Sequence, residues 1–134
     1  MLHARKHAVH ALLASALLTP LVQAAGGIPP LREEGALQYS CGGIGLDEST
    51  AMRAAMKDYP LSLLFSGQGG EYLADVRVDI RGGAQDMRFT ASGPVCLLRL
   101  PEGEYQVQAT TRQGSTQNQK VRVGREPHTL GFRF

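Results

Sequence analysis

The sequence has no long apolar run, and this absence bears first on membrane association. Its most apolar stretch, residues 8–18, is shorter than the roughly 20 residues that a membrane-spanning helix needs. No later segment is apolar enough to cross a bilayer. We therefore expect no permanent membrane anchor.

Histidine and cysteine are also scarce, which limits metal and redox chemistry. Three of the four histidines lie in the first ten residues, so His128 is the only one in the rest of the chain. The sequence contains no close histidine pair after residue 10, no Cys-x-x-Cys motif and no acidic calcium-binding loop. It therefore predicts no metal site and no cofactor.

Residues suited to catalysis are few as well. His128 is the only histidine left for a Ser-His-Asp or Cys-His arrangement, and it follows Pro127 at the start of the last predicted strand, where exposure is the ordinary expectation. Asp47 and Glu48 are adjacent at a predicted helix start, where they project in different directions and capping explains both. No second motif supports either set, so we expect no catalytic residues and a protein that is not an enzyme.

The N-terminus has the three parts of a secretory signal peptide. Arg5 and Lys6 give it a basic start, an apolar run follows, and the small-residue pattern Val-Gln-Ala ends at Ala24. No cysteine stands at the expected cleavage site after Ala24, so no lipid attachment is implied. We expect residues 1–24 to be removed, leaving a periplasmic or secreted protein with no transmembrane segment.

Without residues 1–24, the chain has no excess of positive or negative charge. Of 14 Lys and Arg residues, Arg5 and Lys6 fall within it, which leaves 12 against 12 Asp and Glu residues. Nucleic-acid binding usually needs a concentrated basic footprint, so we expect no nucleic-acid partner. From Arg112 to the end, five basic residues accompany one acid, Glu126. We interpret these cations as solvent-facing side chains of two strands, with an anion-binding surface as the alternative.

Two cysteines, Cys41 and Cys96, remain after the signal peptide. In an oxidising compartment the natural expectation is a disulfide between them. The alternative is that both are small buried apolar groups, as free cysteines often are. The sequence alone does not test the geometry that a disulfide requires.

The chain after the signal peptide is long enough for one domain with one modest core. Residues 25–35 contain two prolines and three glycines with little periodicity, which predicts a flexible leader. We expect a single domain over residues 36–134. It includes a helix over residues 47–59 that begins with Asp47 as N-cap and packs through one apolar face: Met52, Ala55, Met56 and Tyr59.

The stretch GGIGLDE, residues 42–48, resembles a loop that cradles a phosphate at a helix N-terminus. Asp47 and Glu48, however, occupy the positive end of that helix and would repel a phosphate. No lysine follows them. We therefore expect the glycines to serve a sharp turn and close packing rather than anion binding.

Residues after Pro60 alternate between apolar and polar side chains, the pattern of strands. The predicted strands are residues 61–66, 71–81, 86–92, 95–100, 104–112, 116–123 and 128–134. Pairing Ile80 with Met87 and Val78 with Phe89 also pairs Asp79 with Arg88, so apolar and charged residues agree on one hairpin register. A second hairpin pairs Tyr105 with Val123. The fold expected is a mainly β, antiparallel Greek-key sandwich of about seven strands with one N-terminal helix.

Residues 93–123 resemble the carboxypeptidase regulatory-like domain, a prealbumin-like (transthyretin-like) sandwich. The resemblance rests on a leucine strand, a proline and glycine turn, and a following strand that begins with tyrosine: Leu100, Pro101, Gly103, Tyr105 and Val107. With the strand upstream, it covers roughly residues 72–123. The resemblance implies an accessory module without an active site of its own. Hydroxyisourate hydrolases share the fold but rely on several histidines, of which this chain retains one.

Together these patterns predict a non-catalytic exported binding or structural module of the cell envelope, which acts through a sheet edge and turns. The expected partner is an envelope protein or a cell-wall component. Alternatives are an inhibitor of a periplasmic hydrolase, and a small periplasmic hydrolase or carbohydrate-active enzyme.

The candidate binding surface comprises two turns and a nearby tyrosine: Gly67, Gln68, Gly69, Gly70, Tyr72, Pro101, Glu102 and Gly103. The loop at the helix start adds Gly42, Gly43, Gly45, Asp47 and Glu48. The oligomeric state stays open.

Overall fold

The computed structural model describes residues 11–18 and 27–134. The expected cleavage site after Ala24 and the basic residues Arg5 and Lys6 lie outside these ranges. Residues 11–18 contain no helix or strand, and their leucines are almost fully exposed. Within the described ranges, no helix combines the length and apolar character needed to span a membrane.

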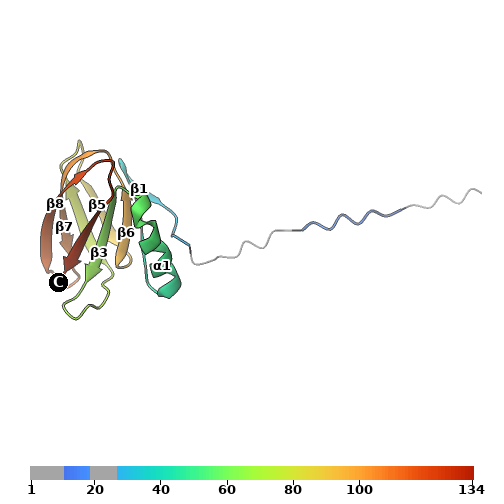
Figure 1. Cartoon of the computed structure of the whole chain (residues 1–134), viewed down its shortest axis with the longest axis horizontal. Helices are drawn as coiled ribbons and strands as arrows, with labels where there is room; N and C mark the ends of the chain where they lie inside the picture. The colour runs from blue at the N-terminus through green and yellow to red at the C-terminus, as the bar shows by residue number, and fades with distance from the viewer. Residues whose placement is uncertain (1–10, 19–26) are drawn as a thin grey trace, which may run out of the picture.

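Nine strands form two sheets that pack face to face, with one helix on the outside (Figure 1). The five strands of sheet A lie in the order β1 (Arg32–Glu34), β2 (Leu37–Gly42), β6 (Val95–Arg99), β3 (Leu61–Ser66) and β9 (His128–Arg133). The four strands of sheet B lie in the order β5 (Met87–Ala91), β4 (Val76–Arg81), β7 (Gly103–Thr110) and β8 (Thr116–Val123). The predicted β-sandwich is therefore confirmed.

The β4–β5 hairpin has the register that the sequence predicts. Val78 pairs with Phe89, Ile80 with Met87, and Asp79 with Arg88. The apolar members are buried, and Arg88 donates a 2.5 Å hydrogen bond from Nε to Oδ1 of Asp79. Period-two alternation thus fixed both the faces of these strands and their pairing.

Two details of sheet B differ from the sequence prediction. β4 begins at Val76 rather than residue 71, because Asp75 has φ 57°, a left-handed conformation that ends the extended run. Tyr105 pairs with Val121 rather than Val123, because the connection is a five-residue turn in which the Thr111 N–H donates to the Ser115 carbonyl at 2.9 Å. The shift is by two residues, so every side chain keeps its predicted face.

Sheet A departs from a purely antiparallel arrangement at β9. This strand pairs in parallel with β3, from Leu61 opposite His128 to Ser66 opposite Arg133. The His128 N–H donates to the carbonyl of Pro60 at 3.1 Å, which sets the start of the pairing.

On the β8–β9 side of the sandwich, side-chain amides connect the two sheets. Gln119 Nε2 donates to the Gly131 carbonyl at 2.6 Å, and Gln117 Nε2 donates to the Arg133 carbonyl. Two outer carbonyls of β9, those of Gly131 and Arg133, therefore have partners on β8.

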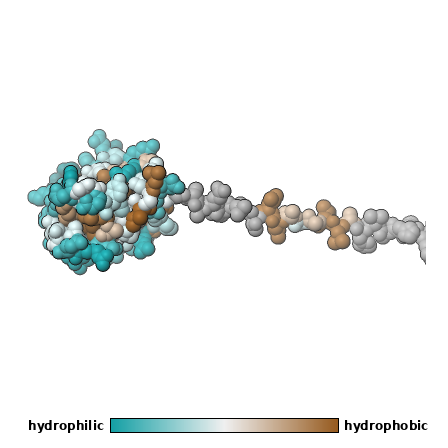
Figure 2. Space-filling model, turned by 90° about the horizontal axis from the view of Figure 1, so that it is seen from below, coloured by the Kyte–Doolittle hydropathy of each residue, from teal (hydrophilic) through white to brown (hydrophobic). Residues whose placement is uncertain are grey.

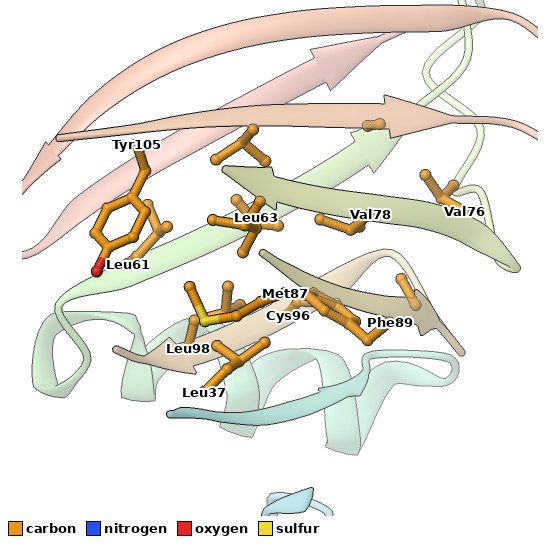
Figure 3. Packing of buried hydrophobic residues seen from close by; sticks show 14 of the residues in the cluster. Leu37, Leu61, Leu63, Val76, Val78, Met87, Phe89, Cys96, Leu98 and Tyr105 are labelled. Atoms are coloured by element: carbon orange, nitrogen blue, oxygen red, sulfur yellow. The ribbon is translucent and has the colours of Figure 1, made fainter. Parts of the chain in front are cut away.

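Apolar side chains from both sheets fill the space between them (Figure 3). Leu63 and Leu98 of sheet A and Val78 of sheet B are fully buried. The rings of Phe65 and Phe132 lie 5.7 Å apart between centroids. Phe132 lies near the end of the last strand and is 1% exposed, so the C-terminus contributes to the core, as its pattern predicts.

Helix α1 (Leu46–Ala55) and the following 3₁₀ turn (Met56–Asp58) cover the outer face of sheet A, on the side opposite β7 and β8 (Figure 1). Met52 and Tyr59 are buried against Val95 and Leu97 of β6. The predicted apolar face is confirmed, although the regular helix ends at Ala55, earlier than the expected residue 59.

The segment predicted as a flexible leader contains a strand. Residues 32–34 form β1, which pairs antiparallel with β2 from Arg32 opposite Tyr39 to Glu34 opposite Leu37. Regular structure therefore begins before Ala36. β1 is short and all three residues are charged and exposed, features that discourage pairing with another chain.

Cys41 and Cys96 form a disulfide between neighbouring strands. The two residues lie directly opposite each other in the β2–β6 ladder, with 4.2 Å between their Cα atoms. The disulfide expectation is confirmed, and such a bond is typical of an oxidising compartment outside the cytoplasm.

Tyr105 anchors the turn that precedes its own strand. Its side chain is 5% exposed, and its hydroxyl donates a 2.7 Å hydrogen bond to the Pro101 carbonyl. A tyrosine that bonds back to the backbone a few residues upstream is also found at the corners of Greek-key sandwiches. Burial raises the pKa of this phenol above its ordinary value of 10.0.

We expect this buried phenol to make the domain less stable at alkaline pH. As pH rises past 10.0, the unfolded chain loses the Tyr105 proton first, so the free energy of unfolding falls. Tyr105→Phe should lose about 1 kcal/mol at neutral pH, from the missing hydrogen bond, and show a shallower alkaline decline. Urea titrations at several pH values measure both. Tyr72→Phe, at an exposed position, is the control and should keep the wild-type profile. A Tyr105→Phe profile parallel to wild type would contradict the expectation.

Candidate functional site

A cleft of about 480 Å³ opens where sheet A and sheet B meet at the β2 and β5 edges. We call it the seam cleft. It is lined by residues from the N-terminal segment, β2, the helix start and the end of β5: Pro29, Pro30, Arg32, Tyr39, Ser40, Cys41, Gly42, Ile44, Glu48, Thr90 and Ser92.

The floor of the seam cleft includes a stretch of β2 whose outer edge has no strand beside it. β1 covers β2 only as far as Tyr39. The Cα distance of 4.2 Å between Cys41 and Cys96 is that of a non-hydrogen-bonded pair, so the Cys41 N–H and C=O point away from β6. The carbonyl accepts a 3.1 Å hydrogen bond from Ser92 Oγ, while residues 11–18 and 27–134 offer the N–H no acceptor.

The N-terminal segment forms one wall of the seam cleft. Ser40 Oγ donates a 2.7 Å hydrogen bond to the Pro29 carbonyl, which holds this segment against β2. Pro29 and Pro30 have no N–H groups, so they do not extend the β1 ladder along β2. The short strand β1 therefore extends no further toward the N-terminus than Arg32, and the seam cleft begins beside that residue.

Exposed apolar side chains border the seam cleft on two sides. Ile44 is 66% exposed and Leu46 is 82% exposed in the loop before and at the start of α1. Ile28 and Leu31 are exposed in the N-terminal segment on the other side. Figure 2 shows apolar side chains on the side of the domain from which this segment leaves. Large exposed apolar groups close together are typical of binding surfaces.

The glycine loop at the helix start is arranged around a carboxylate of the chain itself. Oε1 of Glu48 accepts a 2.8 Å hydrogen bond from the Gly43 N–H, and the position at the positive end of α1 favours its charge. A Cβ on Gly42 would lie 2.2 Å from that oxygen, so a larger residue there would displace the Glu48 carboxylate. Glu48 thus occupies the place where an external anion would bind, in agreement with the interpretation of this loop as structural.

One prediction about this loop is wrong. Asp47 is not the N-cap of α1, because the helix begins one residue earlier, at Leu46. The N-cap is Gly45, with φ 89° and no side-chain hydrogen bond. Of the predicted loop residues, Gly42 and Glu48 line the seam cleft, whereas Gly43, Gly45 and Asp47 do not.

The Gly67–Gly70 turn lies at the same end of the sandwich as the helix start, because β2 and β3 run in the same direction, each antiparallel to β6. Arg133 Nη2 donates a 2.5 Å hydrogen bond to the Gln68 carbonyl, which fixes the turn. Tyr72 is 62% exposed, as expected, and the Arg53 guanidinium lies 5.5 Å from its ring centroid. None of these residues lines the seam cleft.

The turn at Pro101, Glu102 and Gly103 follows β6 and therefore lies at the opposite end of the sandwich. Pro101 lines a separate hollow of about 320 Å³ beside the β1–β2 turn. The structure thus splits the predicted binding surface between two ends of the molecule.

The residues considered for catalysis and metal binding are not assembled into a site. His128 is exposed at the start of β9 and does not line the seam cleft. In the described part of the chain, no three His, Cys, Asp or Glu residues lie close enough together to hold a metal ion.

Comparison with family models and with curated proteins finds no relative of this chain. No family model matches the chain, and no curated protein matches it. The seam cleft therefore has to be interpreted from its own geometry.

Sequence reasoning missed most of the lining of the seam cleft. Pro29, Pro30 and Arg32 were assigned to a flexible leader, and Thr90 and Ser92 were assigned only to a strand end. The two prolines directly before an acidic strand were the available signal, because proline is common beside exposed sheet edges. Nothing local in the sequence placed residues 40 and 90 together.

Proposed function

We propose that this protein is a non-catalytic binding module that acts outside the cytoplasm and docks a partner in the seam cleft. The observation that carries this proposal is the uncovered β2 edge at Cys41, which lies in a cleft of about 480 Å³ bordered by exposed apolar residues. An extended segment of a partner fits such an edge, because its backbone can pair with β2 while its side chains contact Ile44.

The location outside the cytoplasm has two supports. The Cys41–Cys96 disulfide is typical of oxidising compartments. The basic start, apolar run and small-residue pattern of residues 1–24 are typical of a signal peptide. We infer a periplasmic or secreted protein whose partner is an envelope protein or a cell-wall component.

The non-catalytic role also has two supports. The resemblance of residues 72–123 to the carboxypeptidase regulatory-like domain favours an accessory module. The one histidine after residue 24, His128, is exposed and distant in the fold from the lining of the seam cleft, which comes from β2, β5 and the helix start.

Site-specific photocrosslinking in intact cells tests this proposal. A photoreactive amino acid at Ile44, on the rim of the seam cleft, should capture one dominant partner. The same group at Gln113, exposed in the β7–β8 turn, is the matched control and should not capture it. Equal capture at the two positions, or none at Ile44, would contradict the docking site.

A second variant separates binding from catalysis. Because His128 takes no part in the proposed docking, His128→Ala should leave capture at Ile44 unchanged. Loss of capture in His128→Ala, together with a hydrolytic activity that the substitution abolishes, would instead support an enzyme. Capture is measured by mass spectrometry of the crosslinked product, and hydrolysis by incubating the purified protein with the captured partner.

A further inference from the structure

The outer face of sheet B is a second surface with a different chemistry. Helix α1 covers sheet A, whereas nothing in the described part of the chain packs on the outside of β4, β7 and β8. The outward side chains of these strands are charged, amide or hydroxyl groups, including Arg81, Gln106 and Lys120. This face therefore offers polar contacts, in contrast to the seam cleft.

Three of these residues form one row across the sheet. Arg81 pairs with Gln106 between β4 and β7, and Gln106 pairs with Lys120 between β7 and β8. Neighbouring strands lie about 4.8 Å apart, so the two cations stand about 10 Å apart at their backbones, with the amide between them. All three line a hollow of about 300 Å³.

A glycine beside this hollow lets two main chains approach each other closely. Gly82 follows Arg81 with φ 131°, and a Cβ there would lie 2.3 Å from the Glu104 carbonyl oxygen. Gly82 lines the hollow together with Glu104 and Tyr105.

In the described part of the chain, the two cations of this row form no salt bridge, unlike four arginines on the same side of the domain. Arg88 and Arg77 share Asp79, at 2.5 and 3.6 Å. Arg122 lies 3.4 Å from Glu104, and Arg112 lies 3.4 Å from Asp75. Within residues 11–18 and 27–134, Arg81 and Lys120 form no salt bridge, and the Gln106 amide has no hydrogen-bond partner. Carboxylates are nevertheless close to the row, because Glu104 lines the same hollow, and Glu34, Asp79 and Asp86 line a second hollow with Arg81.

We propose that the Arg81–Gln106–Lys120 row binds a phosphate group. Arginine presents a planar fork that matches two phosphate oxygens, lysine adds a point charge, and the glutamine amide donates a neutral hydrogen bond. The two positive charges match the charge of a phosphomonoester, which is close to −2 at neutral pH, and neither is held in a salt bridge within the described ranges. This proposal is independent of docking in the seam cleft, because no residue lines both hollows.

Titration with inorganic phosphate tests the row directly. We expect saturable shifts of the Gln106 side-chain amide signals in NMR spectra, with a Kd on the order of 1 mM. Arg81→Gln with Lys120→Gln should weaken binding about tenfold or more, while circular dichroism shows an intact fold, since both positions are exposed.

The matched control removes the same charge elsewhere. Arg112→Gln with Arg125→Gln takes two exposed cations from outside the row and should change the affinity less than twofold at about 0.15 M salt, where separated surface charges are screened. Equal losses in the two double variants, or shifts that do not saturate, would overturn the proposal.

Binding to lipid vesicles distinguishes a lipid headgroup from a soluble compound as the source of the phosphate group. Phosphatidic acid carries a phosphomonoester, so vesicles that contain it should bind the wild-type protein if the row recognises a lipid headgroup. Phosphatidylcholine vesicles are the reference. Binding of phosphatidic acid vesicles that the Arg81→Gln, Lys120→Gln variant loses assigns the row to a lipid surface. Binding of free phosphate alone assigns it to a soluble phosphate compound.

Discussion

Removing the Cys41–Cys96 disulfide is expected to lower the free energy of unfolding by about 4 kcal/mol. The bond joins residues 55 positions apart, so in the oxidised protein it restricts a large part of the unfolded chain. A domain of this size is usually stable by only about 5–15 kcal/mol, so the loss is a large share of the total. The folded state retains the β2–β6 ladder, and the main effect therefore lies in the unfolded state.

Urea titration of the oxidised and the reduced wild-type protein measures this difference without changing the sequence. Cys41→Ala with Cys96→Ala is the second sample and should match the reduced protein apart from the methyl-sized change at buried Cys96. Alkylation of both cysteines in unreduced protein, or equal midpoints for the oxidised and reduced samples, would contradict the expectation.

Gly93→Ala is expected to lower the free energy of unfolding by about 3 kcal/mol. A Cβ at this position would lie 2.3 Å from the oxygen, 2.6 Å from the carbonyl carbon and 2.8 Å from the Cα of Gly42. All three are backbone atoms, and Gly42 is held in place by its pairing with Val95. A flexible side chain could rotate away, but here one of two main chains has to move.

The control for this substitution is Gly124→Ala, where a Cβ would have no neighbour within 4 Å. Its stability should stay within about 0.5 kcal/mol of wild type. Denaturant midpoints of the three proteins give the comparison. Equal stability of Gly93→Ala and Gly124→Ala would show that the close approach of residues 93 and 42 is not required for folding.

The sequence was most informative where two independent patterns agreed. In the β4–β5 hairpin, the apolar pair Val78–Phe89 and the charged pair Asp79–Arg88 required the same register, and the structure has it. In the β7–β8 hairpin, apolar alternation alone was available, and it does not distinguish registers that differ by two. The choice then depended on the turn, which spans five residues rather than the shorter turn expected.

The alternation of apolar and polar residues also does not predict how deeply a residue on the outer face of sheet B is buried. Alternation places Asp79 on the polar, outward face of its strand, yet it is 8% exposed. Arg77 and Arg88 reach over it from its own strand and from the neighbouring one. Long side chains can cover a shorter one on a polar face, and the sequence pattern records only which face a residue occupies.

The seam cleft could not be predicted for a different reason. It forms where the part of β2 that β1 leaves uncovered lies near β5, the edge strand of the other sheet. Cys41 and Ser92, which meet there, are 51 positions apart. Periodicity assigns residues to strands and faces, but it carries no information about strand order. The three-residue strand β1, whose end at Arg32 determines where the cleft begins, also lies in a segment whose prolines and glycines predicted disorder.

The parallel pairing of β9 with β3 has a consequence for the order of folding. The last strand of the chain completes sheet A against a strand that begins at Leu61, far earlier in the sequence. Because Phe132 is also a central part of the core, this strand supplies both backbone partners and apolar contacts. Contacts between distant segments form slowly, and here they wait for the C-terminal residues. The folding of sheet A is therefore expected to be complete only once β9 has been synthesised and has paired with β3.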